Sequence, residues 1–351
     1  MDIVLLISVV ILLIGAKPCF KKPNSGYISR EQTACINGFF VLIVFLRHFK
    51  GYIELGRFDK VFSVIDGWTG QLIVVPFLFF SGYGIMLSIQ KKGLPYVNSV
   101  MTKRFPKVWF HFAVAVALFV PVNLYLGNHY PLKKILLSMI GWDGIGNSNW
   151  YIFDTLALYA MTFLSFRIFS KDRKKGLYLM FLLTGAFLFF MAKHRPGYWY
   201  NTAIAYPLGM LYASIEPEVG KWFQKLSMNR LIVFTAGGVL LAASSFHKNA
   251  FTSYELFVLG AVLVMLVLSL KVKLGNPLLR FFGKYVFEIY ILQRIPMLLL
   301  KDHISNKYIL FAVCFAVTII ISVLFRLLFD MIDKLFDKLT SNIQKNSKKS
   351  A

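Results

Sequence analysis

The chain has 351 residues, of which 57% are apolar or aromatic and only 16% are charged. Soluble globular proteins carry about 25% charged residues, so this composition excludes an ordinary soluble domain. The 39 Lys and Arg residues against 16 Asp and Glu residues give a formal charge of +23. In a membrane protein such an excess indicates basic cytoplasmic loops that face anionic lipids, so we do not expect a nucleic-acid partner.

Eleven apolar segments follow one another along the chain, and each is long enough, or nearly so, to cross a bilayer as a helix. The first resembles the apolar core of a signal peptide, but Asp2 stands where a basic start is usual and Lys17-Pro18 follows it, so we expect a retained span. We therefore predict an all-α fold, a polytopic transmembrane helix bundle of about ten core spans plus one extra N-terminal span. The segments are 3–16, 34–49, 70–90, 107–126, 150–168, 177–192, 200–214, 231–246, 252–270, 283–300 and 308–328.

The basic residues of the connecting segments collect on one side of this bundle. Alternate connections hold 27 of the 39 Lys and Arg residues, and the rest of the chain holds 12. Because cytoplasmic loops carry the excess of Lys and Arg, we expect Met1 to lie outside and the C-terminus to lie in the cytosol. The basic set consists of residues 17–33, 91–107, 167–176, 216–230, 271–284 and 326–351.

Several kinds of site are disfavoured by residue spacing. The cysteines Cys19, Cys35 and Cys314 lie too far apart for a CxxC metal motif or a disulfide framework, and the histidines show no metal-ligand spacing, so we expect no metal. No phosphate-binding GxxxxGK[ST] loop occurs, and no pair of broken helices marks a transporter. The loops are too short to fold as domains, so any chemistry has to occur within the helix bundle.

His48 is the first candidate for chemistry. It lies 14 residues beyond Ala34 in the segment INGFFVLIVFLRHF, or ~21 Å up a helix that rises about 1.5 Å per residue. An ionisable residue within the membrane suggests function, and a neutral imidazole is a suitable general base. The alternative is an interfacial histidine beside Arg47 and Lys50. Asn37, eleven residues earlier, falls on nearly the same helical face and could line the same cavity. Hydrogen bonding to another helix is the alternative for this residue.

A small-residue patch and a basic cluster come next. Ser81, Gly82 and Gly84 permit close approach of another backbone, for which ordinary helix packing is the simpler interpretation. The basic cluster that follows contains no acidic residue and could bind a polyanionic head such as a nucleotide diphosphate. Topology signalling and lipid contact are the alternatives. The cluster comprises Lys91, Lys92, Lys103, Arg104 and Lys107.

Polar and aromatic residues mark two predicted outer loops and one late span. The loops contain Asn149, Trp150 and Tyr151, and then Trp199 and Asn201. They are either an interfacial aromatic belt or a platform for a sugar.

In the late span, Glu288 follows Lys284 by four residues, which predicts an ion pair on one helical face. The alternative for Glu288, as for Gln293 near the middle of that span, is contact with a substrate.

Three blocks of sequence follow one another in a recognisable order: INGFFVLIVFLRHF; LFFSGYGIML followed by KRFPKVW; and LLRFFGKYVFEIYILQRIP. Together they resemble the acyltransferase 3 family of integral-membrane acyltransferases, which modify sugars and cell-surface glycans. Between them, NWYIFDTLALY and WYNTAIAYPLGM are similar to further family segments. The resemblance divides the chain into an extra span with a basic linker (1–27), an acyltransferase 3-like membrane domain (28–330) and a basic cytosolic tail (331–351).

The resemblance implies roles for individual residues. His48 corresponds to the catalytic histidine, Arg104 to a basic residue that handles the acyl donor, and Lys107 to the place of a second basic residue. Ser81 and Gly82 correspond to the family's SGF segment. Two positions depart from the family: Asn37 stands where an arginine lies eleven residues before the histidine, and Gln293 replaces a late histidine.

The expected function is that of a membrane O-acyltransferase that carries an acetyl group from acetyl-CoA to a hydroxyl of a cell-surface polysaccharide or lipid-linked glycan precursor, without a metal. We expect a bacterial cytoplasmic membrane as its location. Membrane lipids, further copies of the chain and polysaccharide assembly machinery are its expected partners. The alternatives are a transporter or flippase for a lipid-linked sugar, and a non-catalytic subunit of a polysaccharide assembly complex.

Overall fold

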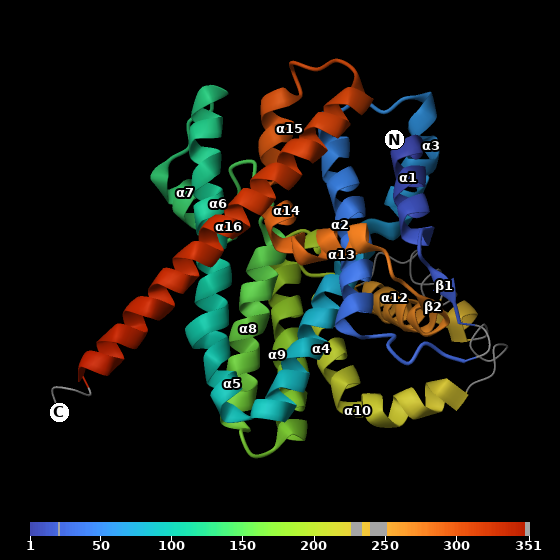
Figure 1. The fold of residues 1–351 in the computed structure, drawn as a ribbon, viewed down its shortest axis with the longest axis vertical. Helices are drawn as coiled ribbons and strands as arrows, with labels where there is room; N and C mark the ends of the chain where they lie inside the picture. The colour runs from blue at the N-terminus through green and yellow to red at the C-terminus, as the bar shows by residue number, and fades with distance from the viewer. Residues whose placement is uncertain (20–21, 226–233, 239–250, 348–351) are drawn as a thin grey trace.

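A computed structural model describes residues 1–19, 22–225, 234–238 and 251–347 (Figure 1). Almost all of these residues are helical, and the described strands form a single two-stranded antiparallel pair, β1 (Lys17–Pro18) with β2 (Val272–Lys273). The all-α prediction is therefore confirmed for the part of the chain that the structure describes.

The helices of the first half carry the segments singled out by sequence. These are α1 (Asp2–Leu13), α2 (Arg30–Phe49), α3 (Lys60–Thr69), α4 (Val75–Lys92), α5 (Leu94–Ser99), α6 (Phe105–Tyr125), α7 (Leu132–Met139) and α8 (Trp150–Ile168). Short 3₁₀ turns join α2 to α4, namely η1 (Lys50–Tyr52), η2 (Arg57–Asp59) and η3 (Gly70–Val74), and a π-helical turn, η4 (Val100–Arg104), leads into α6.

The second half continues with long helices separated by one broken segment. It contains α9 (Arg173–His194), η5 (Gly197–Trp199), α10 (Ala205–Lys225), α12 (Phe251–Lys271), α13 (Pro277–Lys284), α14 (Val286–Leu292), α15 (Arg294–Leu300) and α16 (Lys307–Ser347). The predicted span 283–300 is thus divided. Pro296 has no N–H to donate to the carbonyl of Leu292, which favours an interruption of the helix at this place.

Six helical segments of the described chain are long and apolar enough to cross a membrane. The predicted span 231–246 falls largely outside the described residues, and α8 and α10 form helices that are not among these six. The polytopic membrane architecture is confirmed, whereas the number of about ten spans stays a prediction. The six segments are Arg30–Tyr52, Arg57–Lys92, Leu94–Tyr125, Arg173–His194, Tyr254–Lys271 and Lys307–Lys334.

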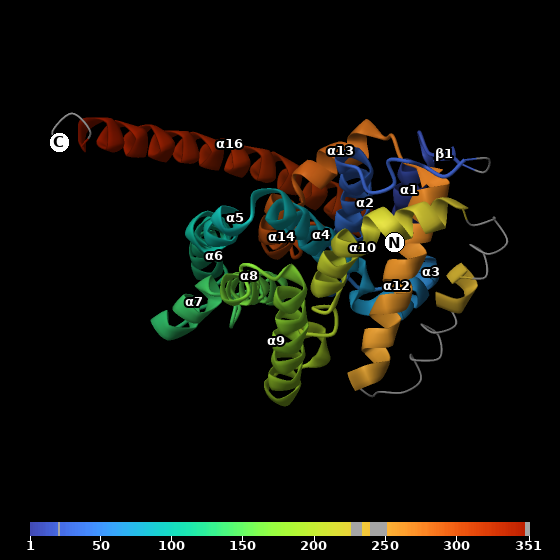
Figure 2. The same cartoon turned by 90° about the horizontal axis from the view of Figure 1, so that it is seen from below.

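The segments predicted on opposite sides of the membrane lie toward opposite ends of the bundle. In Figure 1, α5 and the connection from α8 to α9 lie at the lower end, and the connection from α15 to α16 lies at the upper end. Segment 271–284 packs beside segment 17–33, which is predicted on the same side: β2 pairs with β1, and Arg280 of α13 forms an ion pair with Glu31 at the start of α2. Seen from below, the C-terminal part of α16 projects away from the other helices (Figure 2).

Glycines allow two pairs of helices to pack in backbone contact. A Cβ atom added at Gly38 of α2 would overlap the carbonyl of Leu279 on α13, and one at Gly283 would overlap the carbonyl of Ala34. Likewise, a Cβ atom added at Gly82 of α4 would overlap the carbonyl of Tyr206 on α10. Such close approach is what small residues provide in membrane helices, so these contacts fix α2 and α4 in the positions that form the site.

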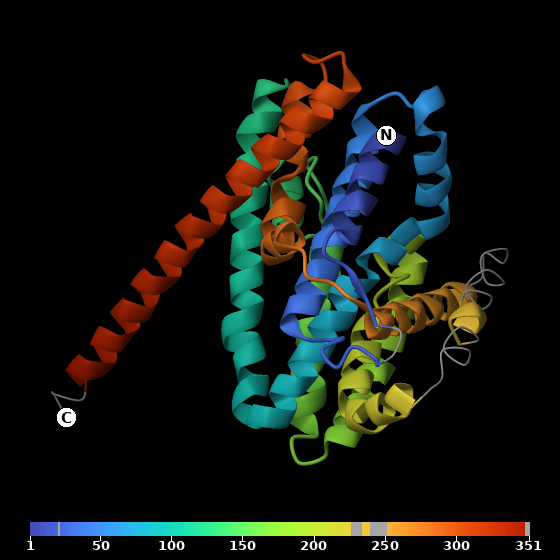
Figure 3. The same cartoon turned by 45° about the vertical axis from the view of Figure 1, so that its right-hand side comes forward.

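The extra N-terminal helix α1 packs beside α2 (Figure 3). Ion pairs anchor its first residue. The N-terminal ammonium of Met1 and the ammonium of Lys307 both pair with the buried carboxylate of Asp59. This cluster connects α1 with η2 and with the beginning of α16.

Candidate functional site

A polar cavity of about 420 Å³ runs between α2, α4, α6, α8 and α14. Asn37 and Thr33 contribute to it from α2, Ser81 from α4, and Tyr151 and Tyr159 from α8. Residues that are far apart in the sequence thus meet at one place. We call this space the polar cavity. It also contains Arg104, Glu288, Tyr290, Lys284 and Arg326.

Arg104 lies at the part of the polar cavity next to α5. The π-helical turn η4 ends at this residue, and Pro106, which has no N–H, follows near the start of α6. The guanidinium donates to the hydroxyl of Tyr96 at 3.0 Å and lies 5.7 Å from the ring centre of Tyr159. Arg104 is exposed and has no carboxylate partner among the described residues. It is therefore a cation that is available for an anionic ligand.

The other predicted basic residues are placed differently. Lys107, one turn further along α6, forms an ion pair with Asp333 of α16, and Lys103 is exposed beside Arg104. Neither residue lines the polar cavity. Gly82 is also outside the lining because it packs against α10, whereas its neighbour Ser81 faces the cavity. The structure therefore brings only Arg104 and Ser81 of the predicted donor residues into this cavity.

His48 lies beyond the other end of the polar cavity. Its ring is 5.9 Å from the ring of Tyr290, which lines the cavity, and the side chain of Gln293 lies beside it. The histidine is half-buried, and its Nδ1 has no hydrogen-bond partner in the described chain. Arg47, which precedes it, donates to Asp66 and to the carbonyl of Gly70, so this arginine is already occupied.

Asn37 and His48 share the face of α2 but not a position in depth. Eleven residues separate them, which corresponds to about 16 Å at about 1.5 Å per residue. The Oδ1 of Asn37 is buried without a partner among the described residues. The two side chains therefore cannot contact the same reacting atom, and Asn37 belongs to the Arg104 part of the site.

Glu288 pairs with a residue that the sequence did not suggest. Its Oε1 lies 3.7 Å from Arg326 of α16, and no ion pair with Lys284 is formed among the described residues. The expected pair between positions 284 and 288 is replaced because α14 begins at Val286, so the two residues do not share a regular helix. Glu288 nevertheless lines the polar cavity.

The predicted outer aromatic residues separate into two groups. Tyr151 lines the polar cavity, and its ring packs 5.3 Å from that of Tyr290. Trp150 packs against Tyr151, and Asn149 precedes α8 with its amide donating to the carbonyl of Asp143. These three residues thus border the site, although only Tyr151 reaches the cavity.

Trp199 and Asn201 lie elsewhere. The ring of Trp199 is 3% exposed and lies 4.5 Å from the guanidinium of Arg195, which also packs over Trp142. Asn201 follows η5, and its backbone N–H donates a hydrogen bond to the carbonyl of Gly197. A buried tryptophan cannot serve as an open sugar platform in this conformation, so these residues are not brought to the polar cavity.

A group of buried polar atoms around Tyr290 was missed by sequence reasoning. The Tyr290 hydroxyl lies close to Ser148, Asp154 and Arg294, and none of these four side chains has all its polar atoms paired within the described chain. Asp154 is fully buried, and neither of its carboxylate oxygens has a partner there. Buried polar groups are costly unless satisfied, so this region is built to contact water or a polar substrate. An isolated Asp within a predicted span was the available signal.

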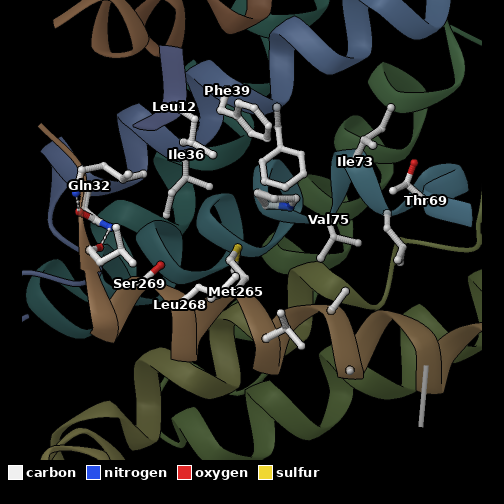
Figure 4. A pocket seen from close by; sticks show the side chains of 18 of the residues that line it. Leu12, Gln32, Ile36, Phe39, Thr69, Ile73, Val75, Met265, Leu268 and Ser269 are labelled. Atoms are coloured by element: carbon white, nitrogen blue, oxygen red, sulfur yellow. Dashed lines mark hydrogen bonds between the residues drawn. The ribbon is translucent and has the colours of Figure 1, made fainter. Parts of the chain in front are cut away.

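A second cavity, the apolar cavity, lies on a neighbouring face of α2 (Figure 4). It has a volume of about 590 Å³ and is enclosed by α1, α2, η3, the beginning of α4 and α12. Ile36 and Phe39 face it from α2, and none of the described residues that line it is ionisable. The amide of Gln32 at its edge is already bonded to the backbone of Val272 and Leu274. This cavity, although the larger one, offers no group for acyl transfer.

The comparisons with known proteins decide the family. The model of the acyltransferase 3 family, described as an acyltransferase domain, matches residues 35–327. The chain belongs to this family. No curated protein and no solved structure gives a significant match. The matched segment contains His48 with most of α2, most of the lining of the polar cavity, and α14, and this agrees with an integral-membrane acyltransferase. Among the described residues, no group of three His, Cys, Asp or Glu side chains could hold a metal ion.

Proposed function

We propose that this acyltransferase carries an acetyl group from acetyl-CoA to a hydroxyl of a cell-surface polysaccharide or lipid-linked glycan precursor. One observation supports the proposal most directly: the polar cavity has a cation at one end, Arg104, and His48 beyond the other end, next to Tyr290. A donor with an anionic head and a long thin arm suits such an elongated site.

The donor would bind with its charged head at Arg104. Arg104 has no carboxylate partner in the described chain, and guanidinium groups form strong charge-assisted hydrogen bonds to phosphate. The arm would then pass Asn37 and Ser81 toward the Tyr151 and Tyr290 rings. The side-chain oxygen of Asn37, which is unpartnered among the described residues, can accept from an amide of the arm. This arrangement leaves the thioester near His48.

His48 would act as the general base. It takes the proton of the acceptor hydroxyl while the hydroxyl oxygen forms a bond to the thioester carbonyl carbon. When the tetrahedral intermediate collapses, the carbon–sulfur bond breaks and the thiolate of CoA receives the proton from the imidazolium. The products are the acetylated hydroxyl and free CoA, so no net proton or electron is required.

Tyr290 is placed to stabilise the intermediate. Its hydroxyl has no hydrogen-bond partner among the described residues, and its ring lies between the polar cavity and His48. A donor that is already oriented toward the developing oxyanion lowers the barrier because it need not reorganise during the reaction. Asn37 and Ser81 lie along the arm of the donor, so Tyr290 takes this role.

The test is acetyl transfer by the purified protein in lipid vesicles. Acetyl-CoA and the polysaccharide isolated from cells that lack the gene are supplied, and glycan acetylation by mass spectrometry is compared with release of CoA thiol. We expect both in equal amounts. Acetyl-CoA that is never consumed, while glycan crosses the membrane, would instead show a transporter.

A further inference from the structure

A third hollow, the outer basin, opens at the end of the bundle opposite to Arg104. It has a volume of about 520 Å³ and is lined by residues that follow α2 and by the connection from α15 to α16. Its polar and aromatic lining consists of Tyr52, Glu54, Lys301, Ser305, Asn306, Lys307 and Tyr308.

The outer basin approaches His48 through two residues. Tyr52 follows His48 by four residues at the end of the same helical segment, and its hydroxyl lies beside the guanidinium of Arg294. Arg294 directly follows Gln293, whose side chain lies beside His48. The Nε of Arg294, the Oε1 of Gln293 and the Nδ1 of His48 are buried and unpartnered within the described chain. Polar groups between the outer basin and the polar cavity are thus available to hydrogen-bond to a ligand or to water.

The chemistry of the lining favours a neutral, hydroxyl-bearing ligand. Glu54 accepts hydrogen bonds, Lys301 donates them and Ser305 does both, which matches hydroxyl groups that both donate and accept. The rings of Tyr52 and Tyr308 supply apolar surface. Both lysines at this place have acidic neighbours, because Lys307 pairs with Asp59 and Lys301 lies 3.8 Å from Asp302. The outer basin therefore differs from the cationic Arg104 end, and a polyphosphate does not suit it.

We propose that the outer basin binds a neutral sugar unit of the glycan acceptor and presents its hydroxyl to His48 past Tyr52 and Arg294. The inference rests on the proposed function and specifies where its acceptor binds. It moves the acceptor away from the Trp199 loop, where the sequence had suggested a sugar platform. Donor and acceptor then approach the histidine from opposite ends of the bundle.

A thiol at the rim tests this placement in the intact, folded protein. Ser305→Cys introduces an exposed cysteine, which is labelled on whole cells with a membrane-impermeant methanethiosulfonate reagent. The matched control is Asn128→Cys, which places an exposed cysteine on another predicted outer loop. The wild type is the background control, because Cys35 and Cys314 are buried and Cys19 lies on the predicted cytosolic side.

We expect the label at position 305, but not at 128, to raise the KM for the polysaccharide from gene-deleted cells at least about tenfold, or ~1.4 kcal/mol. The KM for acetyl-CoA should stay unchanged. The polysaccharide should also slow labelling at position 305, a binding readout that needs no catalysis.

Unchanged KM for the polysaccharide together with no protection would overturn the acceptor site. Protection by free pyrophosphate instead of the polysaccharide would do the same. Protection without any acetyl transfer by the wild type would support the outer basin while refuting the proposed function.

Discussion

Two faces of α2 border cavities of opposite character. The polar cavity on one face contains Arg104, Asn37 and Glu288, whereas the larger apolar cavity on a neighbouring face has no ionisable side chain among its described lining residues. A single helix, α2, can therefore contribute polar residues to a reaction site and apolar residues to a cavity that could hold a hydrocarbon chain. The difference teaches that volume does not identify the reaction site in this bundle, because acyl transfer needs groups that bind charge and move protons.

Among substitutions around the polar cavity, removal of the proposed general base, His48, should lower the rate of acetyl transfer most. We expect His48→Ala to lower the rate of acetyl transfer by roughly 10²- to 10⁴-fold, the usual contribution of general base catalysis. The measurement is acetylation of the glycan at saturating acetyl-CoA. His48→Gln, which keeps a polar side chain, is expected to be similarly inactive. Normal transfer by His48→Ala in correctly inserted protein would exclude this residue as the base.

Removing the Tyr290 hydroxyl should have the next largest effect. We expect Tyr290→Phe to lower kcat by roughly 10²-fold, a typical loss for an oxyanion donor, with little change in the KM for acetyl-CoA. Steady-state kinetics of the purified protein separate these two constants. Tyr130→Phe on a predicted outer loop serves as the matched control. A change in KM alone would show that Tyr290 only contacts the bound donor.

Arg104, at the end of the polar cavity away from His48, should affect the binding of acetyl-CoA and not the rate of the chemical step. We expect Arg104→Ala to raise the KM for acetyl-CoA by about 10- to 100-fold, since a charge-assisted hydrogen bond contributes about 1.5–3 kcal/mol. Arg104→Lys should recover part of the loss. Lys107→Ala is the contrasting variant, because Asp333 already engages Lys107. An equal effect of both variants would indicate general attraction by the basic surface.

A pair of identical substitutions compares the two cavities directly and should give the smallest effect. Val108 lines the polar cavity one turn beyond Arg104, and Val264 lines the apolar cavity. We expect Val108→Phe to raise the KM for acetyl-CoA about fivefold, within the roughly 1–3 kcal/mol that overpacking costs. Val264→Phe should leave this KM within about twofold. The opposite result would show that the donor occupies the apolar cavity.

Much of the fold could be predicted from the sequence because hydropathy is a local property. A run of apolar residues predicts a membrane helix whatever its neighbours are, and this held for α2, α4, α6, α9, α12 and α16. The break between α14 and α15 was missed, although Pro296 supplied a signal for it. The pairing of Glu288 was also missed, because a rule for residues four apart assumes one continuous helix.

The site was only partly predictable. His48 and Arg104 were selected by their sequence segments, and the structure places both beside or within the polar cavity's lining. Asp154 and Tyr290 were not selected, because an aspartate or tyrosine within an apolar segment gains meaning only from what surrounds it. Their unpartnered atoms become visible once α8 and α14 are packed together.

The sequence by itself determined that the chain is a helical membrane protein and which segments resemble a membrane acyltransferase. Composition and motif order are sufficient for those conclusions because each span is stabilised by lipid on its own. Only the tertiary structure decided which polar residues meet. Backbone contacts at Gly38 and Gly82 hold α2 against α13 and α4 against α10. No local pattern encodes these pairings, because the partners are far apart in the sequence.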